Sequence, residues 1–368
     1  MTQSDTQTIL AYIGTYTRSM PHVQARAEGI YLYRFDATSG ALEQVGVARN
    51  VDNPSYLAIR PDQTYLYAAN EVGDFGGQSS GAVSAFSIDP QSGALTFINQ
   101  QPTGGAAPCY VTVDASGQYV LSANYTGGSV CVHPVQADGS LGEATDFIQH
   151  EGSSVNPRRQ EGPHAHSINL SPDNRFAFAA DLGMDKLLIY KLEGGKLTPN
   201  SQPWVAAQPG VGPRHFDFHP SGQYAYLINE IGNTVVAYAY DEADGRLEEL
   251  QTIATLPPDF EGRSHTADIH VHPSGKFVYG SNRGHDSIVI YAIDQATGRL
   301  TLAGYESTQG KVPRNFTIDP TGNFLLAANQ NTDNIATYHI DPDSGKLTPT
   351  GHIVEAPTPV CIKMMVVS

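Results

Sequence analysis

Five residues in this sequence combine side-chain types that can bind an anion and move protons. They are His166, Arg214, Glu230, Arg283 and Arg314. Guanidinium groups bind carboxylates and phosphates through paired hydrogen bonds, and they stabilise negative charge on oxygen. An imidazole and a carboxylate can exchange protons with water near neutral pH. If the fold brings these side chains together, they form a site for a small anionic substrate with acid–base groups.

The elements that must position these residues belong to a pattern that occurs seven times. Each copy contains a strand, a glycine-containing turn and a leucine that opens the next strand, as in GAVSAFSIDPQSGAL at 81–95. The leucines lie 46 to 56 residues apart, at Leu42, Leu95, Leu141, Leu197, Leu247, Leu300 and Leu347. Two apolar strands joined by a Pro/Asp/Gly turn precede six of the copies, as in PRHFDFHPSGQYAYLIN at 213–229. Such repeats are typical of β-propeller blades.

The seventh copy is divided between the two ends of the chain. TQTILAYIGTYT near the N-terminus supplies its second strand, and PTPVCIKMMVVS at the C-terminus supplies its first. Joining both ends in one blade closes the ring and leaves no open sheet edge. The sequence therefore predicts an all-β, seven-bladed β-propeller with four antiparallel strands per blade. One blade is closed by the N- and C-terminal strands, and residues 1–368 form a single domain.

The composition fits this fold and excludes several classes of partner. The 36 Gly, 24 Pro and 19 Tyr suit many short strands joined by turns. A formal net charge of −16 argues against binding to nucleic acid or to an anionic membrane. Three cysteines are too few for a disulfide framework, and their odd number fits a reducing compartment. The N-terminus lacks a signal-peptide pattern, and no stretch approaches the roughly 20 apolar residues of a membrane span. We therefore expect a soluble cytoplasmic protein.

The strand order predicts which face of the disc carries the chemistry. With strands a to d numbered outward from the axis, the a–b and c–d turns are tight and lie on one face. Longer b–c and d–a connections, such as 70–81 and 146–166, lie on the other face, where loops on a rigid scaffold usually carry function. The first residues of strand a should point there: Ser55, Cys109, His166, Arg214, Ala267, Arg314 and Val360. So should the residues that follow strand b: Thr15, Glu71, Tyr125, Leu182, Glu230, Arg283 and Gln330. Antiparallel pairing brings both sets together at one mouth.

Each candidate also has a structural interpretation. An arginine at a propeller rim often pairs with an acid of the next blade. Other blades place Ser, Cys, Ala or Val at the first position of strand a, so the scaffold needs no charge there. Two H-x-H motifs, at 164–166 and 270–272, could hold a metal, but no third ligand follows the first at metal spacing. We interpret His219, His270 and His272 as structural, and we expect neither a metal nor another cofactor.

Four motifs carry a resemblance to a known family. These are GPHAHS at 162–167, GPRH at 212–215, the Asn229–Glu230 pair and SNR at 281–283. With its strand pattern, the whole chain resembles the propeller-type lactonase family, which includes bacterial 6-phosphogluconolactonase and the fungal carboxymuconate cyclase. The resemblance implies that a histidine together with Arg214, Glu230 and Arg283 forms the active site. That histidine is His164 or His166, and the repeat alignment favours His166.

The resemblance implies a lactonase of carbohydrate metabolism. We expect hydrolysis of a small anionic sugar lactone, 6-phosphogluconolactone to 6-phosphogluconate in the pentose phosphate pathway. A carboxymuconate lactonising or delactonising isomerase and a non-catalytic, protein-binding propeller are the alternatives. The expected partner is the small lactone, with no nucleic acid or membrane.

Each expected site residue receives a role from its chemistry. Arg214 and Arg283 would stabilise the oxyanion, Glu230 would orient or deprotonate water, and His166 would transfer protons. The expected substrate-binding residues are His164, Glu71, Lys311 and Arg314, of which Lys311 and Arg314 are the candidates for a phosphate.

Overall fold

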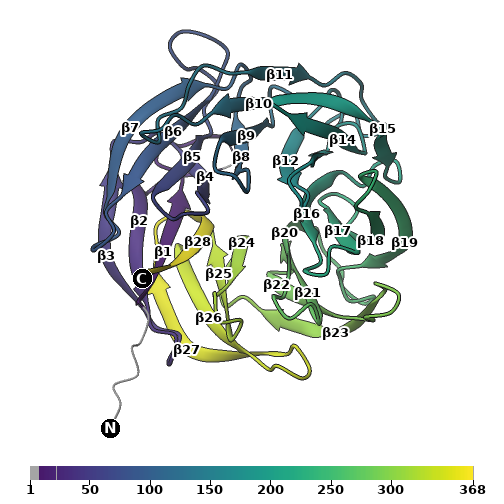
Figure 1. The fold of residues 1–368 in the computed structure, drawn as a ribbon. Coiled ribbons are helices and arrows are strands. Elements are labelled where there is room, and N and C mark those ends of the chain that lie inside the picture. Colours follow the sequence, from purple (N-terminus) through teal and green to yellow (C-terminus); the bar gives the residue numbers. More distant parts are fainter. Residues whose placement is uncertain (1–7, 22, 368) are drawn as a thin grey trace.

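The computed structural model describes residues 8–21 and 23–367, and within them every regular element is a β-strand. The strands form seven four-stranded antiparallel sheets arranged as blades around a central axis (Figure 1). The predicted seven-bladed propeller is confirmed. Residues 1–7, 22 and 368, which the single-domain prediction also includes, lie outside the described residues. No helix long and apolar enough to cross a bilayer occurs in the described ranges.

Each blade contributes one strand to each of four concentric positions. The innermost strands line the axis: β28 (Pro359–Val367), β4 (Pro54–Ile59), β8 (Pro108–Val113), β12 (Ala165–Leu170), β16 (Pro213–Phe218), β20 (His265–Val271) and β24 (Pro313–Ile318). The second strands are β1 (Thr8–Thr15), β5 (Tyr65–Asn70), β9 (Tyr119–Asn124), β13 (Phe176–Asp181), β17 (Tyr224–Asn229), β21 (Phe277–Arg283) and β25 (Phe324–Asn329).

The two outer positions complete the blades. The third strands are β2 (Gly29–Phe35), β6 (Ala82–Ile88), β10 (Ser129–Pro134), β14 (Lys186–Glu193), β18 (Thr234–Asp241), β22 (Ser287–Ile293) and β26 (Asn334–Ile340). The outermost are β3 (Leu42–Arg49), β7 (Leu95–Pro102), β11 (Asp146–Gln149), β15 (Lys196–Ala206), β19 (Arg246–Ala254), β23 (Leu300–Ser307) and β27 (Leu347–Glu355).

The two ends of the chain meet in one blade. β28 lies beside β1, with Ile13 opposite Ile362 and Tyr12 opposite Lys363. Figure 1 shows the yellow C-terminal strand next to the purple N-terminal strands. This pairing closes the ring through backbone hydrogen bonds, as the divided seventh repeat predicts.

Apolar side chains fill the spaces between neighbouring blades. Every residue of β25 is buried, because a middle strand is covered on both faces by adjacent blades, whereas most residues of the outermost β27 are exposed or half-buried. At one such interface Phe178 of β13 stacks on Phe216 of β16 with ring centroids 5.3 Å apart. Burial of one such ring stabilises the fold by about 1.5–3 kcal/mol.

The tight-turn face carries a hydrogen bond that recurs from blade to blade. The Tyr226 hydroxyl of β17 donates to the carbonyl oxygen of Gly298, in the turn between the two outer strands of the next blade, at 3.0 Å. Tyr12, Tyr67 and Tyr279 make the same bond to Gly93, Gly139 and Gly345. Gly298 has a φ of +68°, and a Cβ there would lie 2.3 Å from the Tyr224 ring, so the turn requires glycine. These bonds fix four of the blades against the next blade.

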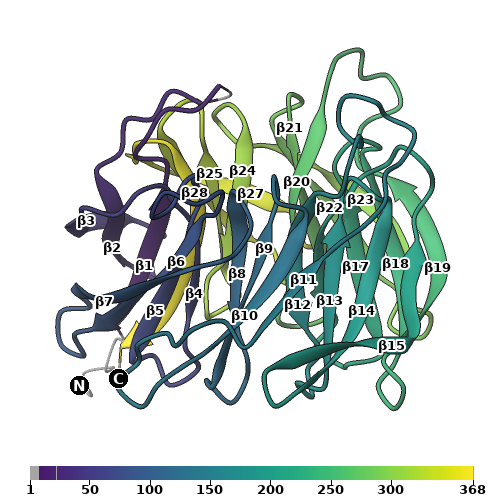
Figure 2. The ribbon, with the colours of Figure 1, turned by 90° about the horizontal axis from the view of Figure 1, so that it is seen from above.

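Two histidines on this face have the expected structural role. His219 Nε2 donates to Gly275 O of the next blade at 2.8 Å, and His272 Nε2 donates to Gly322 O at 2.8 Å. The opposite face carries the long connections 16–28, 71–81 and 150–164. Figure 2 shows the disc from its side, with the end of β28 at the tight-turn face.

Candidate active site

The innermost strand of each blade has a β-bulge near its first residue, at the mouth of the channel. In β16, Pro213 pairs with Asn229 and His215 pairs with Ile228, which leaves Arg214 without an opposite residue. A bulge of this kind redirects the extra side chain and is frequent beside active sites. The register shifts at the same place in all seven blades, at Val360, Ser55, Cys109, His166, Arg214, Ala267–Asp268 and Arg314. The first set of predicted mouth residues is therefore the set of bulge residues.

A cavity of about 330 Å³ lies where these bulges meet the ends of the second strands. Its lining residues are Glu71, Cys109, Tyr125, Arg159, His166, Glu230, His265, Arg283 and Arg314. A narrow extension towards the axis is lined by Ser55, Tyr56, Glu71, Cys109, His166, Arg214, His215, Arg314 and Val360. Six of the eight residues predicted for the site thus line this cavity or its extension.

Glu230 is the centre of an ionic cluster on one side of the cavity. Its Oε2 accepts a hydrogen bond from Arg214 Nε at 2.8 Å and is 2.9 Å from Arg283 Nη2, while its Oε1 is 2.6 Å from Arg159 Nη2. Burial alone would raise the pKa of Glu230, but the guanidiniums of Arg283, Arg214 and Arg159 hold it well below its usual range. The carboxylate is therefore ionised, and both of its oxygens are engaged.

His166 is buried at its bulge and faces a positively charged environment. Its Nδ1 lies 3.6 Å from Cys109 Sγ, and its ring meets the edge of the Tyr125 ring with centroids 5.4 Å apart. Burial and the nearby Arg214 lower the pKa of His166 well below its usual value, so the imidazole is neutral at neutral pH. Its Nε2 has no hydrogen-bond partner among the described residues, which leaves that nitrogen for a ligand.

The opposite side of the cavity holds a second, less engaged set of charges. Glu71 Oε2 accepts a hydrogen bond from the Tyr16 hydroxyl at 2.9 Å, and its Oε1 has no partner in the described part of the chain. The Arg314 guanidinium lies over the Tyr16 ring, 5.8 Å from its centroid. Within residues 8–21 and 23–367, this guanidinium makes no hydrogen bond or ion pair. Its donors are therefore available to an anionic ligand.

Two of the predicted substrate-binding residues lie outside the cavity. The His164 ring stacks on Tyr125 with centroids 4.7 Å apart, and its Nδ1 donates to Tyr125 O at 3.0 Å. The Lys311 ammonium is exposed and pairs with Asp286 at 3.0 Å. Of the two histidines that the GPHAHS motif left open, His166 is the one that lines the cavity.

Arg159 also lines the cavity, although it is not among the residues that the sequence predicts for the site. This arginine comes from the 150–164 connection, the longest of the seven that lead from an outermost strand to the next innermost strand, and its Nη2 also donates to the Tyr125 hydroxyl at 3.1 Å. The base of this loop is anchored by buried His150, whose Nδ1 is 2.6 Å from Asp181 Oδ2 and whose Nε2 is 3.1 Å from the Tyr190 hydroxyl. The available signal was the adjacent pair Arg158–Arg159 in a chain with only 21 Lys and Arg.

Beneath the mouth, His270 belongs to a buried network on the channel side of β20. Its Nε2 lies 3.0 Å from Asp268 Oδ2, and Asp268 Oδ1 lies 2.6 Å from His215 Nδ1. His270 therefore has a position unlike that of His219 and His272. Among the described residues, no three His, Cys, Asp or Glu side chains are grouped as metal ligands.

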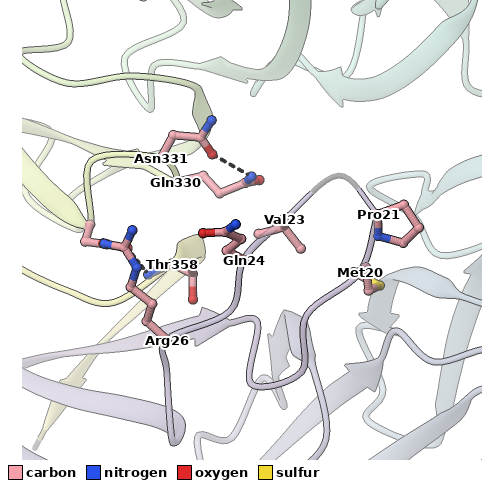
Figure 3. A pocket seen from close by; sticks show the side chains of 9 residues that line it. Met20, Pro21, Val23, Gln24, Arg26, Gln330, Asn331 and Thr358 are labelled. Atoms are coloured by element: carbon pink, nitrogen blue, oxygen red, sulfur yellow. Dashed lines mark hydrogen bonds and ion pairs between the residues drawn. The ribbon is translucent and has the colours of Figure 1, made fainter.

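A larger cavity of about 470 Å³ lies between the blades of β1 and β25 on the loop face (Figure 3). Its described lining residues are Met20, Pro21, Val23, Gln24, Arg26, Gln330, Asn331, Asp333 and Thr358. The charged members of this lining, Arg26 and Asp333, form an ion pair with each other. Figure 3 shows the Gln330–Asn331 amide contact at its edge. The smaller cavity, with its surplus of guanidiniums, is the better candidate for chemistry.

Comparisons with known proteins show which family has this fold. The family model described as "Lactonase, 7-bladed beta-propeller" matches residues 10–364. The 6-phosphogluconolactonase of Bacillus subtilis is 40% identical over 310 residues, which cover 84% of this chain and 85% of that protein. The 6-phosphogluconolactonase of Formosa agariphila is 36% identical over 84% of this chain and 86% of its own. The structure of the periplasmic gluconolactonase of Pseudomonas aeruginosa superposes with a TM-score of 0.90 at 36% identity, over 98% of this chain and all of the other.

Proposed function

The chain belongs to the seven-bladed β-propeller lactonase family, and from this premise we propose that it hydrolyses 6-phosphogluconolactone to 6-phosphogluconate. Membership makes the protein a lactonase, an enzyme that opens a cyclic ester with water. The curated relatives named above carry the 6-phosphogluconolactonase name at 36% to 40% identity. That reaction belongs to the pentose phosphate pathway.

The observation that carries the choice of an anionic substrate is the uncommitted guanidinium of Arg314. The cavity and its extension hold four arginines, Arg159, Arg214, Arg283 and Arg314, against the two carboxylates Glu71 and Glu230. Three of the four bind Glu230, whereas Arg314 has no acceptor among the described residues. A guanidinium held on an aromatic face with free donors suits a phosphate, which accepts paired hydrogen bonds.

Two arginines are placed to stabilise the transition state of ester hydrolysis. Attack of water on the lactone carbonyl places negative charge on the carbonyl oxygen. Glu230 binds Arg214 and Arg283 through the same oxygen, Oε2, so the two guanidiniums converge at the floor of the cavity. In this proposal they donate to the developing oxyanion. Because both oxygens of Glu230 are already engaged, its role is to orient the arginines rather than to deprotonate water.

His166 is the proposed carrier of the proton. As a neutral imidazole with an unpartnered Nε2, it can accept a proton from the attacking water. It can then return that proton to the ring oxygen as the carbon–oxygen bond breaks. The resulting imidazolium would be short-lived, because burial and Arg214 disfavour its positive charge. The open Oε1 of Glu71 is placed to accept a hydrogen bond from a sugar hydroxyl.

Substrate and location are linked in this proposal. The Pseudomonas aeruginosa relative is a periplasmic gluconolactonase, so the fold also serves an enzyme named for the unphosphorylated lactone. A phosphorylated sugar lactone is a cytoplasmic metabolite, and we therefore propose a cytoplasmic location. Arg314 is the residue that would distinguish the two lactones, with Lys311 left outside the cavity by its pairing with Asp286.

The test measures turnover of 6-phosphogluconolactone, gluconolactone and a carboxymuconolactone by the purified protein, with and without chelator, after subtraction of spontaneous hydrolysis. We expect the highest kcat/KM on the phosphorylated lactone. Arg314→Gln should raise KM for that substrate about 10-fold or more and leave KM for gluconolactone nearly unchanged, because a charge-assisted phosphate contact contributes about 1.5–3 kcal/mol. Equal kcat/KM values on the two sugar lactones would contradict the assignment to the phosphorylated substrate.

A further inference from the structure

Arg214 is fixed by three acceptors in addition to lining the floor of the cavity. Its Nε donates to Glu230 Oε2 at 2.8 Å, and its Nη1 donates to the Ala267 carbonyl and to His215 Nε2, the latter at 3.3 Å. The residue is 1% exposed. Its Nη2 has no acceptor among the described residues, and it is the part of the guanidinium left for a ligand. The direction of Nη2 therefore depends on the groups that hold Nε and Nη1.

His215 can serve as an acceptor for Arg214 only in one protonation state and one tautomer. Burial and the adjacent Arg214 lower the pKa of His215 to about 4, so the ring is neutral at neutral pH. Its Nδ1 is 2.6 Å from Asp268 Oδ1 and must carry the proton, because a carboxylate only accepts. The lone pair is then on Nε2, which faces Arg214. The carboxylate thus selects the tautomer that the guanidinium needs.

Asp268 is itself fixed by contacts that involve three inner strands. Its Oδ2 accepts from His270 Nε2 at 3.0 Å and from the Asn315 amide, and Asn315 Oδ1 accepts from the Ile362 backbone N–H at 2.7 Å. Burial would raise the pKa of Asp268, but His270 and His215 hold it well below its usual range. The carboxylate is therefore ionised and fixed from β20, β24 and β28. A charge buried this deeply stabilises a fold little by itself, which favours a role beyond stability.

We propose that His215 and Asp268 are positioning residues for the lactonase reaction, which hold the Arg214 guanidinium in the orientation that receives the oxyanion. Neither residue lines the main cavity, and His215 lines only its narrow extension. This inference rests on the proposed function, in which Arg214 stabilises the transition state. It adds a carboxylate–imidazole–guanidinium chain that extends from the channel interior to the reacting carbonyl.

The primary variant is His215→Asn, compared with His219→Asn. In the first variant the asparagine amide retains a donor towards Asp268, and the acceptor for Arg214 is lost. His219 stands four residues later, and within the described part of the chain its side chain hydrogen-bonds Ser221 and Gly275 at the tight-turn face, so its replacement tests a purely structural loss. We expect His215→Asn to lower kcat about 10- to 100-fold at nearly unchanged KM, since small misplacements of a reacting group cost factors of that size. His219→Asn should lower Tm and leave kcat unchanged.

A double-mutant cycle separates positioning from general destabilisation. Arg214→Lys removes the planar guanidinium that His215 orients. If His215 acts through Arg214, adding His215→Asn to Arg214→Lys changes kcat less than about twofold, while its effect on Tm persists. The proposal is overturned if His215→Asn lowers kcat by the same factor in both backgrounds, or leaves kcat of the otherwise unmodified enzyme unchanged. Absence of lactone turnover in the wild type would instead overturn the proposed function, and this proposal with it.

Discussion

The two faces of the propeller differ in how far their residues repeat from blade to blade. At the tight-turn face, one kind of contact recurs: a tyrosine hydroxyl or a histidine Nε2 donates to a glycine carbonyl of the next blade. At the mouth, the bulge position holds a different residue type in most blades, from Ala267 to Arg214. A position that makes the same contact in many blades supports the scaffold. A position that makes no such repeated contact can hold a side chain with a chemical role.

The two faces also differ in how much their polar contacts contribute to stability. The tight-turn face uses neutral hydrogen bonds, each of which contributes about 0.5–1.5 kcal/mol to stability. The mouth buries Glu230 and Arg214, and such buried ions recover their desolvation cost only through close pairing. An apolar pair of the same volume would stabilise the fold equally well. We therefore expect the ionic cluster to serve function rather than stability, and the two regions should respond differently to substitution.

The largest expected effect is that of Glu230→Gln at the mouth. The neutral amide cannot balance the charges of Arg159, Arg214 and Arg283, and its NH2 group replaces the acceptor either of Arg159 or of Arg214 and Arg283. We expect kcat/KM to fall about 10³-fold, since loss of one oxyanion donor alone costs about 10²–10³. The free energy of unfolding should fall by about 3 kcal/mol, as for other broken buried ion clusters.

Lactone turnover and chemical denaturation measure the two consequences of Glu230→Gln. Glu43→Gln on the outermost strand β3 is the control, because its carboxylate is exposed and pairs with the exposed Arg34. It should change neither quantity. A fully active Glu230→Gln enzyme would show that the arginine cluster does not serve catalysis.

The difference between the two ends also explains what the sequence could predict. Seven leucines at regular intervals establish the propeller and its closure without any knowledge of side-chain contacts. Comparison of the repeats also finds His166, Arg214 and Arg314, because they replace Ser, Cys, Ala or Val at equivalent positions. The bulge that aims them into the channel leaves no sequence signal of its own, although it occurs in every blade.

Comparison of the repeats cannot find residues outside the repeat, and it does not show which side chains form ion pairs in the fold. Arg159 lies in a loop longer than the equivalent loops of the other blades, so an alignment of blades could not place it beside Glu230. Lys311 is near Arg314 in sequence, yet its pairing with Asp286 turns it out of the cavity. His270 has the same H-x-H spacing as His164 and His166, and only the fold shows that it binds Asp268 beneath the mouth.

A matched pair of Tyr→Phe substitutions, one on each face, should have effects of intermediate size. Tyr125→Phe at the mouth removes the hydroxyl that accepts from Arg159 at 3.1 Å, and Tyr226→Phe removes the bond to Gly298 at the tight-turn face. We expect Tyr125→Phe to lower kcat/KM roughly 3- to 10-fold with little change in Tm. Tyr226→Phe should lower the free energy of unfolding by about 1 kcal/mol at unchanged kcat/KM. Steady-state kinetics and denaturant titration on both variants measure these effects. The opposite pattern would show that the mouth does not serve catalysis and the tight-turn face does not serve stability.

The smallest expected effect is the response of the mouth to mild acid. The groups that face His166 are Cys109, Tyr125, Arg214, His215, Glu230 and Arg314. Burial and the positive neighbours lower the pKa of His166 well below 6.5, and the imidazole must be neutral to accept a proton. We therefore expect kcat/KM to stay constant as pH falls through about 6.5, the value of an unperturbed histidine, and to decline only at lower pH.

The free energy of unfolding should change with pH in the same direction. The contribution from His166 is complete above about pH 6.5 and decreases below it, because the unfolded chain gains the proton first. Lactonase assays between about pH 5 and 8 at constant ionic strength test this, and an inflection near 6.5 that disappears in His166→Asn would show that His166 is solvated and titrates normally.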